Sequence, residues 1–540
     1  MKKLIFFVLV AVLAITACKK DPDPEPIMAQ EVILNKTTLT LEVGDSDLLI
    51  ATILPTNADD KTIRWVSSNN DVARVDQFTG MITAFMPGTC TIRAATNGAF
   101  AVCEITVTYK TVVEGRYGSL NWKLLQDGTF IVSGEGAMPS REWEDYILQI
   151  KRVIINDGVI SIGDYAFHNC VNLSDIIIPN SVTNIGKYAF YGTSLAGVTI
   201  PNSVTNIGNY AFYGNSLTDV TIPNSVTNIG DFAFYGNSFT DVTIPNSVTN
   251  IGEYTFSHCY DLTRLTISAA NIGEGAFGNC ESLANIIISD GVTNIGKYAF
   301  FGCRGLTDVT ISNSVTNIGD HAFENCGILS DIIIPNSVTN IGDYAFNNCN
   351  LSNVIIHEGV KDIGEYAFAN CRELTELTIP NGVINIGNCA FGNCAKLTEL
   401  TIPNSVTSFG DWTFRDCGLR SVIISNNATS IGSGVFYGCG LLSSVNIPGS
   451  ITSIGEFAFS GCHSLLSVTI PSNVTSIGIG VFWSWRLKSV TIMAIIPPTL
   501  NVLDNFLCDD DTLYVPKGCV DLYKADEAWN SAFTTITEQP

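Results

Sequence analysis

The block that decides the fold reads Ile318-Gly-Asp-His-Ala-Phe323-Glu-Asn-Cys326-Gly-Ile-Leu329-Ser-Asp-Ile332-Ile-Ile334-Pro335-Asn-Ser-Val338-Thr-Asn340. It recurs along the chain, and the Gly after its first Ile marks fifteen copies spaced 21 to 23 residues apart: Gly163, Gly186, Gly208, Gly230, Gly252, Gly273, Gly296, Gly319, Gly342, Gly364, Gly387, Gly410, Gly432, Gly455 and Gly478. A fixed period of this length is typical of a solenoid, in which each short unit stacks on the next because it cannot bury its apolar face alone. Such proteins present a long surface, and most of them bind rather than catalyse.

One strand is expected in each copy. The run from Leu329 to Ile334 alternates with period 2, which predicts one strand per coil in a parallel sheet. Its Leu, together with Ile332 and Ile334, is expected to face inward. Asp331 and Ile333 are then expected to face the solvent.

The rest of the copy is expected to complete the coil. Val338 and Ile341 predict a second, short apolar edge, and Gly342 is expected to make a turn. The segment from Tyr344 to Phe346 is expected to fill the interior from a short helical or irregular stretch. With coils about 4.8 Å apart, fifteen coils would make a rod of roughly 70 Å.

The pattern Ile-Gly-x-x-Ala-Phe-x-x-Cys…Leu-x-x-Val-x-Ile-Pro resembles the BspA-type leucine-rich repeat from about Ile150 to Ile492. The resemblance implies a curved, β-rich solenoid on a cell surface, often an adhesin for host matrix proteins or for other bacteria. The family has no shared catalytic residue, and its members bind different things, so the ligand does not follow from the resemblance.

The chain before the repeats has a different pattern. Between residues 29 and 110, short alternating runs are separated by turn signals such as Asn97-Gly98, which predicts an all-β sandwich. The segments Ile63-Arg-Trp65-Val-Ser-Ser-Asn69 and Gly80-Met-Ile-Thr-Ala84 resemble the bacterial immunoglobulin-like domain of group 2. That resemblance implies a stalk or an adhesive module.

Dissimilar units are expected to close the repeats at both ends, because a bare solenoid end exposes unpaired strand edges. Residues 111–150 are interpreted as the N-terminal cap, 151–495 as the leucine-rich repeats and 496–540 as the C-terminal cap. Trp483 and Trp485, in the last coil, are expected to pack under that cap.

The N-terminus has the pattern of an export signal. Two lysines precede an apolar run from Leu4 to Ile15 that is too short to be a membrane span. The small residues before Cys18 resemble a bacterial lipoprotein box, which implies that 1–17 is a signal peptide and that Cys18 carries a lipid anchor. An ordinary signal peptide that happens to contain a Cys is the alternative.

The acidic, Pro-rich stretch 18–28 is expected to be an extended tether. It resembles the stretch that sends Bacteroidetes lipoproteins to the outer face of the outer membrane, which implies exposure on the cell surface. A periplasmic lipoprotein would need only the Cys.

Seventeen cysteines in an exported chain would ordinarily suggest disulfides. Eleven of them lie three residues after the repeat Phe, and equivalent positions on stacked coils point the same way, so a ladder of buried free thiols is expected: Cys170, Cys259, Cys280, Cys303, Cys326, Cys349, Cys371, Cys394, Cys417, Cys439 and Cys462. Two other pairs, Cys90 with Cys103 and Cys508 with Cys519, stay open between thiols and disulfides.

The exposed strand face is the candidate ligand-binding surface. The position two after the repeat Leu carries seven acids and one Arg264, and the acids are Asp175, Asp219, Asp241, Asp308, Asp331, Glu376 and Glu399. Two positions further on lies a column of Thr and Ile. One interpretation is that the acids only keep an exposed sheet soluble. The other is that this face docks a basic protein segment or holds divalent cations between coils, in which case salt should weaken binding.

Net charge and the motifs present argue against two classes of function. A net charge of -23 argues against a nucleic-acid partner, which would need a basic patch. No catalytic residue set, cofactor motif or metal-ligand spacing emerges, so an enzyme is not expected.

The leading hypothesis is a lipid-anchored adhesin or interaction protein for host extracellular or bacterial surface proteins, touching the membrane only through its anchor. The alternative is a glycan-binding lipoprotein for nutrient capture, which exposed Trp and Tyr lining a pocket in the cap would support.

Overall fold

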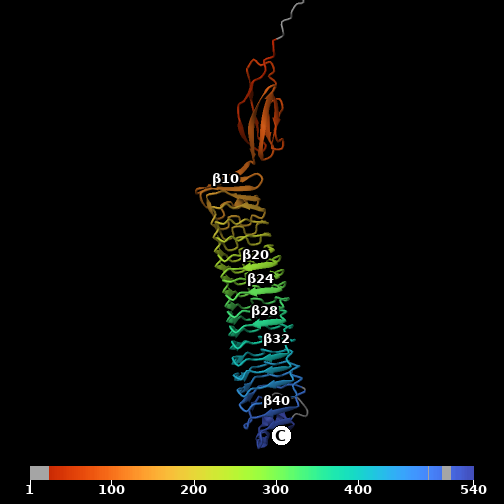
Figure 1. The fold of residues 1–540 in the computed structure, drawn as a ribbon. Coiled ribbons are helices and arrows are strands. Elements are labelled where there is room, and N and C mark those ends of the chain that lie inside the picture. The colour runs from red at the N-terminus through yellow and green to blue at the C-terminus, as the bar shows by residue number, and fades with distance from the viewer. Residues whose placement is uncertain (1–23, 485, 502–511) are drawn as a thin grey trace, which may run out of the picture. The chain divides into compact units, whose positions relative to one another are not determined.

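The structure, a computed structural model, describes residues 24–484, 486–501 and 512–540. Cys18, the signal segment 1–17, Trp485 and Cys508 lie outside these residues. The chain splits into two compact units, Met1–Val112 with Leu125–Asp127 and Val113–Leu124 with Gly128–Pro540. The first is an immunoglobulin-like β-sandwich and the second a solenoid with a cap at each end (Figure 1).

The sandwich has a four-stranded sheet in the order β2-β9-β8-β5, a three-stranded sheet β3-β7-β6 and the pair β1-β4. Alternating apolar positions of the two larger sheets, among them Trp65, Ile82 and Ile105, are buried between them. The strands are β1 Glu31–Leu34, β2 Thr38–Glu42, β3 Ser46–Leu48, β4 Ala51–Leu54, β5 Arg64–Ser67, β6 Ala73–Val75, β7 Met81–Ala84, β8 Gly88–Thr96 and β9 Ala99–Thr108. The predicted hairpin at Asn97-Gly98 joins β8 to β9, and Gly98 adopts the positive φ of +100° that such a turn requires.

Cys90 and Cys103, which the sequence left open between thiols and a disulfide, are two free thiols. Cys90 on β8 lies opposite Ile105, and Cys103 on β9 lies opposite Ile92, and both side chains are buried. They act as small apolar residues of the sandwich core.

The N-terminal cap of the solenoid consists of β10 Thr111–Tyr117, β11 Leu120–Leu125, β12 Thr129–Gly134, β13 Gly136–Ala137 and the 3-10 helix η1 Glu144–Tyr146. The hairpin β11-β12 is antiparallel, and β12 then pairs in parallel with the first long solenoid strand. The buried Trp143 packs on the first Phe of the repeats, Phe167. The cap therefore covers the core at this end and provides the first strand for the parallel sheet.

The predicted strand forms in most copies, but not at residues 198–200 and 220–222, and these strands make a column of parallel strands along one face of the solenoid. Pairing is broken at several points, so the column comprises separate sheets. Its strands are β14 Arg152–Ile155, β16 Asp175–Ile177, β20 Asp241–Ile244, β22 Arg264–Ile267, β24 Asn285–Ile288, β26 Asp308–Ile311, β28 Asp331–Ile334, β30 Asn353–Ile356, β32 Glu376–Leu377, β34 Glu399–Thr401, β36 Ser421–Ile423, β38 Ser444–Asn446, β40 Ser467–Ile470 and β42 Ser489–Ile492. As predicted, Asp331 and Ile333 are exposed whereas Ile332 and Ile334 are buried.

The second apolar edge forms another parallel column, continuous over thirteen strands from β13 to β35 and resumed from β37 to β43. After β13 its strands are β15 Val159–Ile162, β17 Asn184–Ile185, β18 Asn206–Ile207, β19 Asn228–Ile229, β21 Asn250–Ile251, β23 Asn271–Ile272, β25 Asn294–Ile295, β27 Asn317–Ile318, β29 Asn340–Ile341, β31 Asp362–Ile363, β33 Asn385–Ile386, β35 Ser408–Phe409, β37 Ser430–Ile431, β39 Ser453–Ile454, β41 Ser476–Ile477 and β43 Thr499–Leu500. Asn side chains on neighbouring strands hydrogen-bond to one another, as Asn340 Nδ2 does to Asn317 Oδ1 at 3.1 Å.

The C-terminal cap continues the long-strand column with β44 Thr512–Val515 and β45 Thr535–Glu538, which are joined by the helices α1 Val520–Ala525 and α2 Glu527–Ala532. Tyr523 and Trp529 are fully buried and close the core at this end. Because both caps extend the strand column, the solenoid has about 17 turns, more than the fifteen repeat copies.

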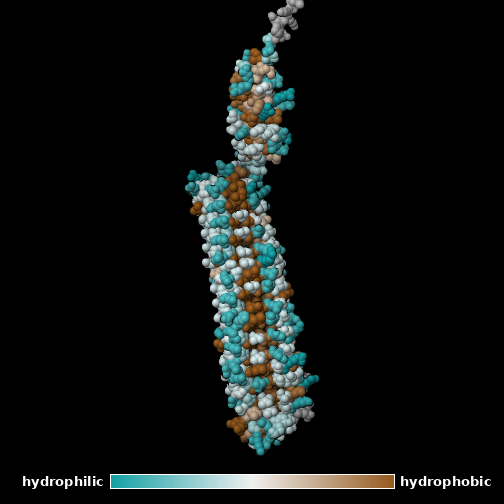
Figure 2. Space-filling view, in the orientation of Figure 1, coloured by the Kyte–Doolittle hydropathy of each residue, from teal (hydrophilic) through white to brown (hydrophobic). Residues whose placement is uncertain are grey.

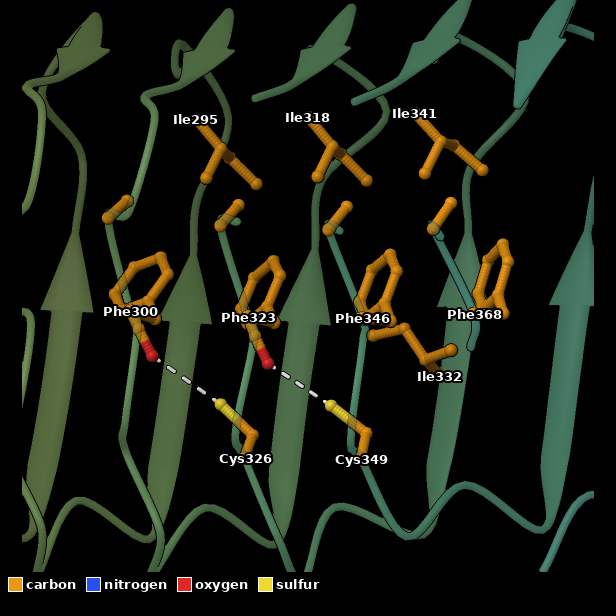
Figure 3. Close-up of a cluster of buried hydrophobic side chains, with 14 of the residues drawn as sticks. Ile295, Phe300, Ile318, Phe323, Cys326, Ile332, Ile341, Phe346, Cys349 and Phe368 are labelled. Atoms are coloured by element: carbon orange, nitrogen blue, oxygen red, sulfur yellow. Dashed lines mark hydrogen bonds between the residues drawn. The ribbon is translucent and has the colours of Figure 1, made fainter. Parts of the chain in front are cut away.

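Inside the coils, equivalent side chains stack into columns (Figure 3). The repeat Phe rings stack from Phe167 to Phe482 with centroids 5.1 to 5.8 Å apart. All eleven repeat cysteines are buried free thiols, as predicted. The Sγ–H of Cys326 donates to the Phe300 carbonyl of the preceding coil at 3.4 Å, and Cys349 bonds to Phe323 in the same way.

Gly342 begins a turn, as predicted, and its carbonyl accepts from the Ala345 N–H at 3.3 Å. Its lack of a side chain also lets coils approach, because a Cβ there would lie 2.5 Å from the backbone nitrogen of Asp320. The expectation that Tyr344 fills the interior was wrong. Tyr344 takes a positive φ of 58°. Its ring is consequently directed away from the core and stays half-exposed, while Ala345 and Phe346 are buried.

Candidate binding face on the long strands

The candidate site residues lie on the exposed face of the long-strand column. Strand pairing places them in a single file, because each repeat contributes the same position, as in the register Asp331↔Asn353↔Glu376. All seven predicted acids are exposed: Asp175, Asp219, Asp241, Asp308, Asp331, Glu376 and Glu399. The neutral Asn285 and Asn353 occupy the same file.

Two arginines neutralise part of this file. Arg264 Nε donates to Asp241 Oδ1 at 2.5 Å and holds the pKa of that carboxyl below its usual value. Arg152, which the sequence analysis did not place in the file, lies opposite Asp175 in the register and pairs with it at 2.9 Å. No described partner forms an ion pair with the other five acids, so the unneutralised charge is concentrated on Asp219 and on the stretch from Asp308 to Glu399.

An apolar stripe runs beside the acids. The column two residues further on consists mainly of Thr and Ile, and Figure 2 shows it as a brown and white line along the face that carries β20, β24, β28 and β32. Its isoleucines are exposed to between 41% and 56%, namely Ile177, Ile287, Ile333, Ile355 and Ile423. Exposed isoleucines beside unpaired carboxylates are not needed for solubility, and such a patch is typical of an interaction surface.

Two hollows open on this face where strand pairing is lost. One, of about 860 Å³, lies between β32 and β34, which belong to different sheets, and Glu376 and Glu399 line it with Thr378 and Thr401. The other, of about 580 Å³, is lined by Asp219 in the coils between β16 and β20, where the long-strand column has no strand. Both hollows are polar, shallow recesses in a flat face.

The chemical groups that the face presents are few in kind. Within the described parts of the chain, no group of three or more His, Cys, Asp or Glu side chains could hold a metal ion. The thiols are buried and poorly ionised, since burial raises the pKa of Cys259, Cys303 and Cys462 to about 12. The face offers carboxylates, hydroxyls and isoleucine side chains in repeating rows.

A second surface feature was missed from the sequence. Two parallel stacks of rings, half-exposed, run along the turns of five consecutive coils, and we call them the aromatic double ladder: Tyr165, Tyr188, Tyr210, Phe232 and Tyr254, beside His168, Tyr191, Tyr213, Tyr235 and His258. Neighbouring centroids in each stack lie 4.6 to 5.1 Å apart, so the ring faces cover one another. The signal was the recurrence of aromatic residues on both sides of Ala-Phe. From the sequence, the aromatic residue before Ala is predicted to fill the interior, and no prediction is made for the one after Phe.

Stacking of this kind leaves only ring edges and hydroxyl groups toward the solvent. Arg141 closes the N-terminal end of the ladder, with its guanidinium 4.6 Å from the Tyr165 ring centroid. At the other end Gly275 accommodates Tyr254, because a Cβ there would lie 2.4 Å from that ring. A sugar ring could not stack on these covered faces, although their edges suit protein contacts.

Among the described residues of the caps, most large aromatic side chains are covered, although the half-buried Trp122 lines an open recess of about 510 Å³ in the N-terminal cap. In the C-terminal cap Tyr523 and Trp529 are buried, and in the N-terminal cap the indole of Trp122 lies against Phe130 and Gly115. Trp483 is 46% exposed, so the expectation that it packs under the cap was wrong. No helix in the described part of the chain is long and apolar enough to span a membrane.

Two family models match the chain. The model described as the BspA type leucine-rich repeat region matches residues 144–263, 270–398 and 384–499, and the bacterial Ig-like domain of group 2 matches residues 28–113. The first covers more than half of the chain. Both describe repeat or Ig-like scaffolds.

Individual relatives are similar over shorter or more divergent stretches. An uncharacterized protein of Clostridium acetobutylicum is 37% identical over 87 residues, 16% of this chain and only 9% of that protein's length. A leucine-rich repeat protein from Bacteroides ovatus is 24% identical, with a TM-score of 0.47 over 79% of this chain and 100% of that one. A protein described as a leucine rich cell surface protein, from Faecalibacterium prausnitzii, is 20% identical, with a TM-score of 0.28 over 80% of this chain and 96% of that one.

Proposed function

Because the chain belongs to the BspA type leucine-rich repeat family, we propose that it is a cell-surface interaction protein that binds host or bacterial surface proteins through its long-strand face. The observation that carries this proposal is the pairing of an acidic file with an exposed Ile and Thr stripe along the same strands. Five acids there have no described ion-pair partner. A basic protein surface with apolar side chains is complementary to such a face.

Repetition favours an elongated partner. Coils lie about 4.8 Å apart, so Asp308 and Glu399, four coils apart, present carboxylates along roughly 19 Å of one line. A partner that contacts several coils gains from each additional contact without a new kind of interaction. The individual exposed charge pairs are expected to be weak, and the isoleucines between them supply the desolvated part of the contact.

We further propose that the chain is anchored by a lipid on Cys18 and exposed on the outer membrane. The support is the sequence pattern of residues 1–28 alone. Metabolic labelling with a fatty acid and protease accessibility on intact cells test the two parts of this proposal. Labelling that persists after Cys18→Ser would contradict the anchor.

Glycan capture is the second candidate function, and the observation that favours it is the exposed indole of Trp483 in the last coil. In that case the ligand would be neutral and would bind near the C-terminal cap. Binding would then depend on Trp483 and would be insensitive to charge changes in the acidic file.

The first experiment is binding of purified residues 29–540 to immobilised matrix proteins, bacterial surface proteins, mucin and glycans at low and high salt. The test variant is Glu376→Lys/Glu399→Lys, which reverses the charge of the larger hollow. The matched control is Glu253→Lys/Glu456→Lys, which makes the same change at exposed positions after repeat glycines, outside the strand column.

Saturable binding to a protein that weakens with salt, is lost in the test variant and is kept in the control is the expected result. Loss of at least tenfold in affinity corresponds to about 1.4 kcal/mol, which two charge contacts can supply. Equal binding by both variants would contradict a role for the strand face. Binding to glycans alone would favour the second candidate.

A further inference from the structure

The Ig-like unit exposes an apolar surface that its own fold does not explain. On the outer face of the sheet β2-β9-β8-β5, Val66 is 61% exposed, Phe100 is 59% exposed and Val102 is 39% exposed. The register aligns Val66, Arg93 and Val102 in one row across three strands and puts Phe100 opposite Ala95 in the next row. These large side chains therefore form a single patch.

Two arginines lie within this patch. Arg93 extends over the ring of Phe100, 4.2 Å from its centroid, and Arg64 is its diagonal neighbour on the adjacent strand, about 7–8 Å away. Neither forms an ion pair with a described residue. We call Arg64, Val66, Arg93, Phe100 and Val102 the basic-apolar patch. Aromatic residues and arginine beside exposed aliphatic side chains are the composition of binding hot spots.

The same chain carries the complementary surface. In the sheet β28-β30-β32 the register places the exposed Ile333 beside the exposed Ile355, and in the neighbouring file Asp331 and Glu376 flank the neutral Asn353. Asp331 and Glu376 are two coils apart, about 10 Å, which matches the reach of the two arginine side chains. We call these five residues the acidic-apolar patch.

We propose that the basic-apolar patch of one copy docks on the acidic-apolar patch of a second copy, so that the protein associates with itself through unlike surfaces. The contact would place Arg64 and Arg93 near Asp331 and Glu376, with Phe100 and Val66 against Ile333 and Ile355. It rests on the proposed function, because it uses the same strand face, and it names one partner of that face.

The contact joins unlike surfaces, so two copies can satisfy both contacts reciprocally in a two-fold dimer, or each copy can bind a different neighbour and build a chain. In either case association should increase with concentration, and salt should weaken it because charges contribute.

Sedimentation of purified residues 29–540 and two charge-reversed variants tests this directly. One variant, Arg64→Glu/Arg93→Glu, loses only the basic-apolar patch, and the other, Asp331→Arg/Glu376→Arg, loses only the acidic-apolar patch. Either alone should be monomeric, because its two patches then carry charge of the same sign, while a mixture of the two should associate, because each patch of one variant is complementary to the unlike patch of the other. A single chain with all four changes should associate again. Lys61→Glu/Glu456→Arg is the matched control and should associate like the unmodified chain.

A monomeric unmodified chain at every concentration up to the millimolar range would overturn the proposal, as would a dimer that both variants still form. If that chain nonetheless binds a protein through Glu376 and Glu399, the proposed function stands and only self-association is wrong. If the two variants are monomeric alone and associate when mixed while no foreign protein binds, self-association stands and binding of host or bacterial proteins is wrong.

Discussion

At the residue scale, the repeat cysteines show how burial sets both the reactivity of the thiols and the pH dependence of the protein's stability. A thiol whose pKa is raised to about 12 in the folded protein, as for Cys259 and Cys303, stays neutral where an unfolded thiol of pKa about 8.5 ionises. The folded state then holds more protons than the unfolded state between these values, so stability is full below about pH 8.5 and falls as pH rises.

We therefore expect the urea midpoint under reducing conditions to drop steeply from pH 8 to pH 10.5, each thiol contributing up to about 1.4 kcal/mol per pH unit. A variant with Cys280→Ala, Cys303→Ala and Cys326→Ala, three thiols whose pKa burial raises, should be less stable at pH 7, but its stability should decline less with pH. At pH 8 the folded chain should also resist thiol reagents until urea unfolds it. Rapid modification of the folded protein would show that the thiols are not buried as described.

The repeat glycines give a second residue-scale prediction. Gly342→Ala would place a Cβ 2.5 Å from the Asp320 nitrogen of the preceding coil, and the backbone there cannot move without separating coils. We expect a loss of about 1–3 kcal/mol in the free energy of unfolding, as for other overpacked sites. Gly449→Ala, which meets nothing within 4 Å, is the control and should change stability by less than about 0.5 kcal/mol. Equal effects in urea melts would contradict the close-approach explanation.

At the scale of the element, the two strand columns differ in what they do. The short strands pair without a break over thirteen coils and carry a hydrogen-bonded Asn ladder, so they hold the coils together. The long strands are interrupted, and their outer face carries the charges, the isoleucines and both hollows. Structural continuity and the proposed binding surface thus lie on different faces of the same coil.

Because the charged residues lie on the long-strand face, a substitution at Arg264 tests how the charge of that face affects binding. The ion pair of Arg264 with Asp241 is exposed to solvent, so Arg264→Ser should leave the stability of the fold nearly unchanged. The change frees a carboxylate in the acidic file, so affinity for a basic partner at low salt should rise and its salt dependence should steepen. Calorimetric melts and binding at two salt concentrations measure both effects. Weaker binding would mean that Arg264 itself contacts the ligand.

At the scale of the whole molecule, the features that could be predicted from the sequence are those that every repeat copy shares. Fifteen copies repeat the same constraint, so the inward and outward positions, the thiol ladder and the single file of acids could all be derived from one copy. What could not be derived depends on contacts between copies. The positive φ at Tyr344, the register of Arg152 with Asp175, the double aromatic ladder and the breaks in strand pairing each arise from how one coil packs on the next.

Coils that interact only with their neighbours should also be removable as units. Deleting residues 209–230 joins Gly208 to Asp231 and removes one coil of 22 residues from the near-identical copies, after which Tyr188 can stack on Phe232 as it now stacks on Tyr210. We expect a folded protein with an unchanged circular dichroism spectrum, shorter by about 4.8 Å in small-angle scattering. Deleting residues 209–219, half a coil, breaks the register and should abolish the cooperative melt. If both deletions fold equally well, or both fail, the stacked-coil account of this solenoid is wrong.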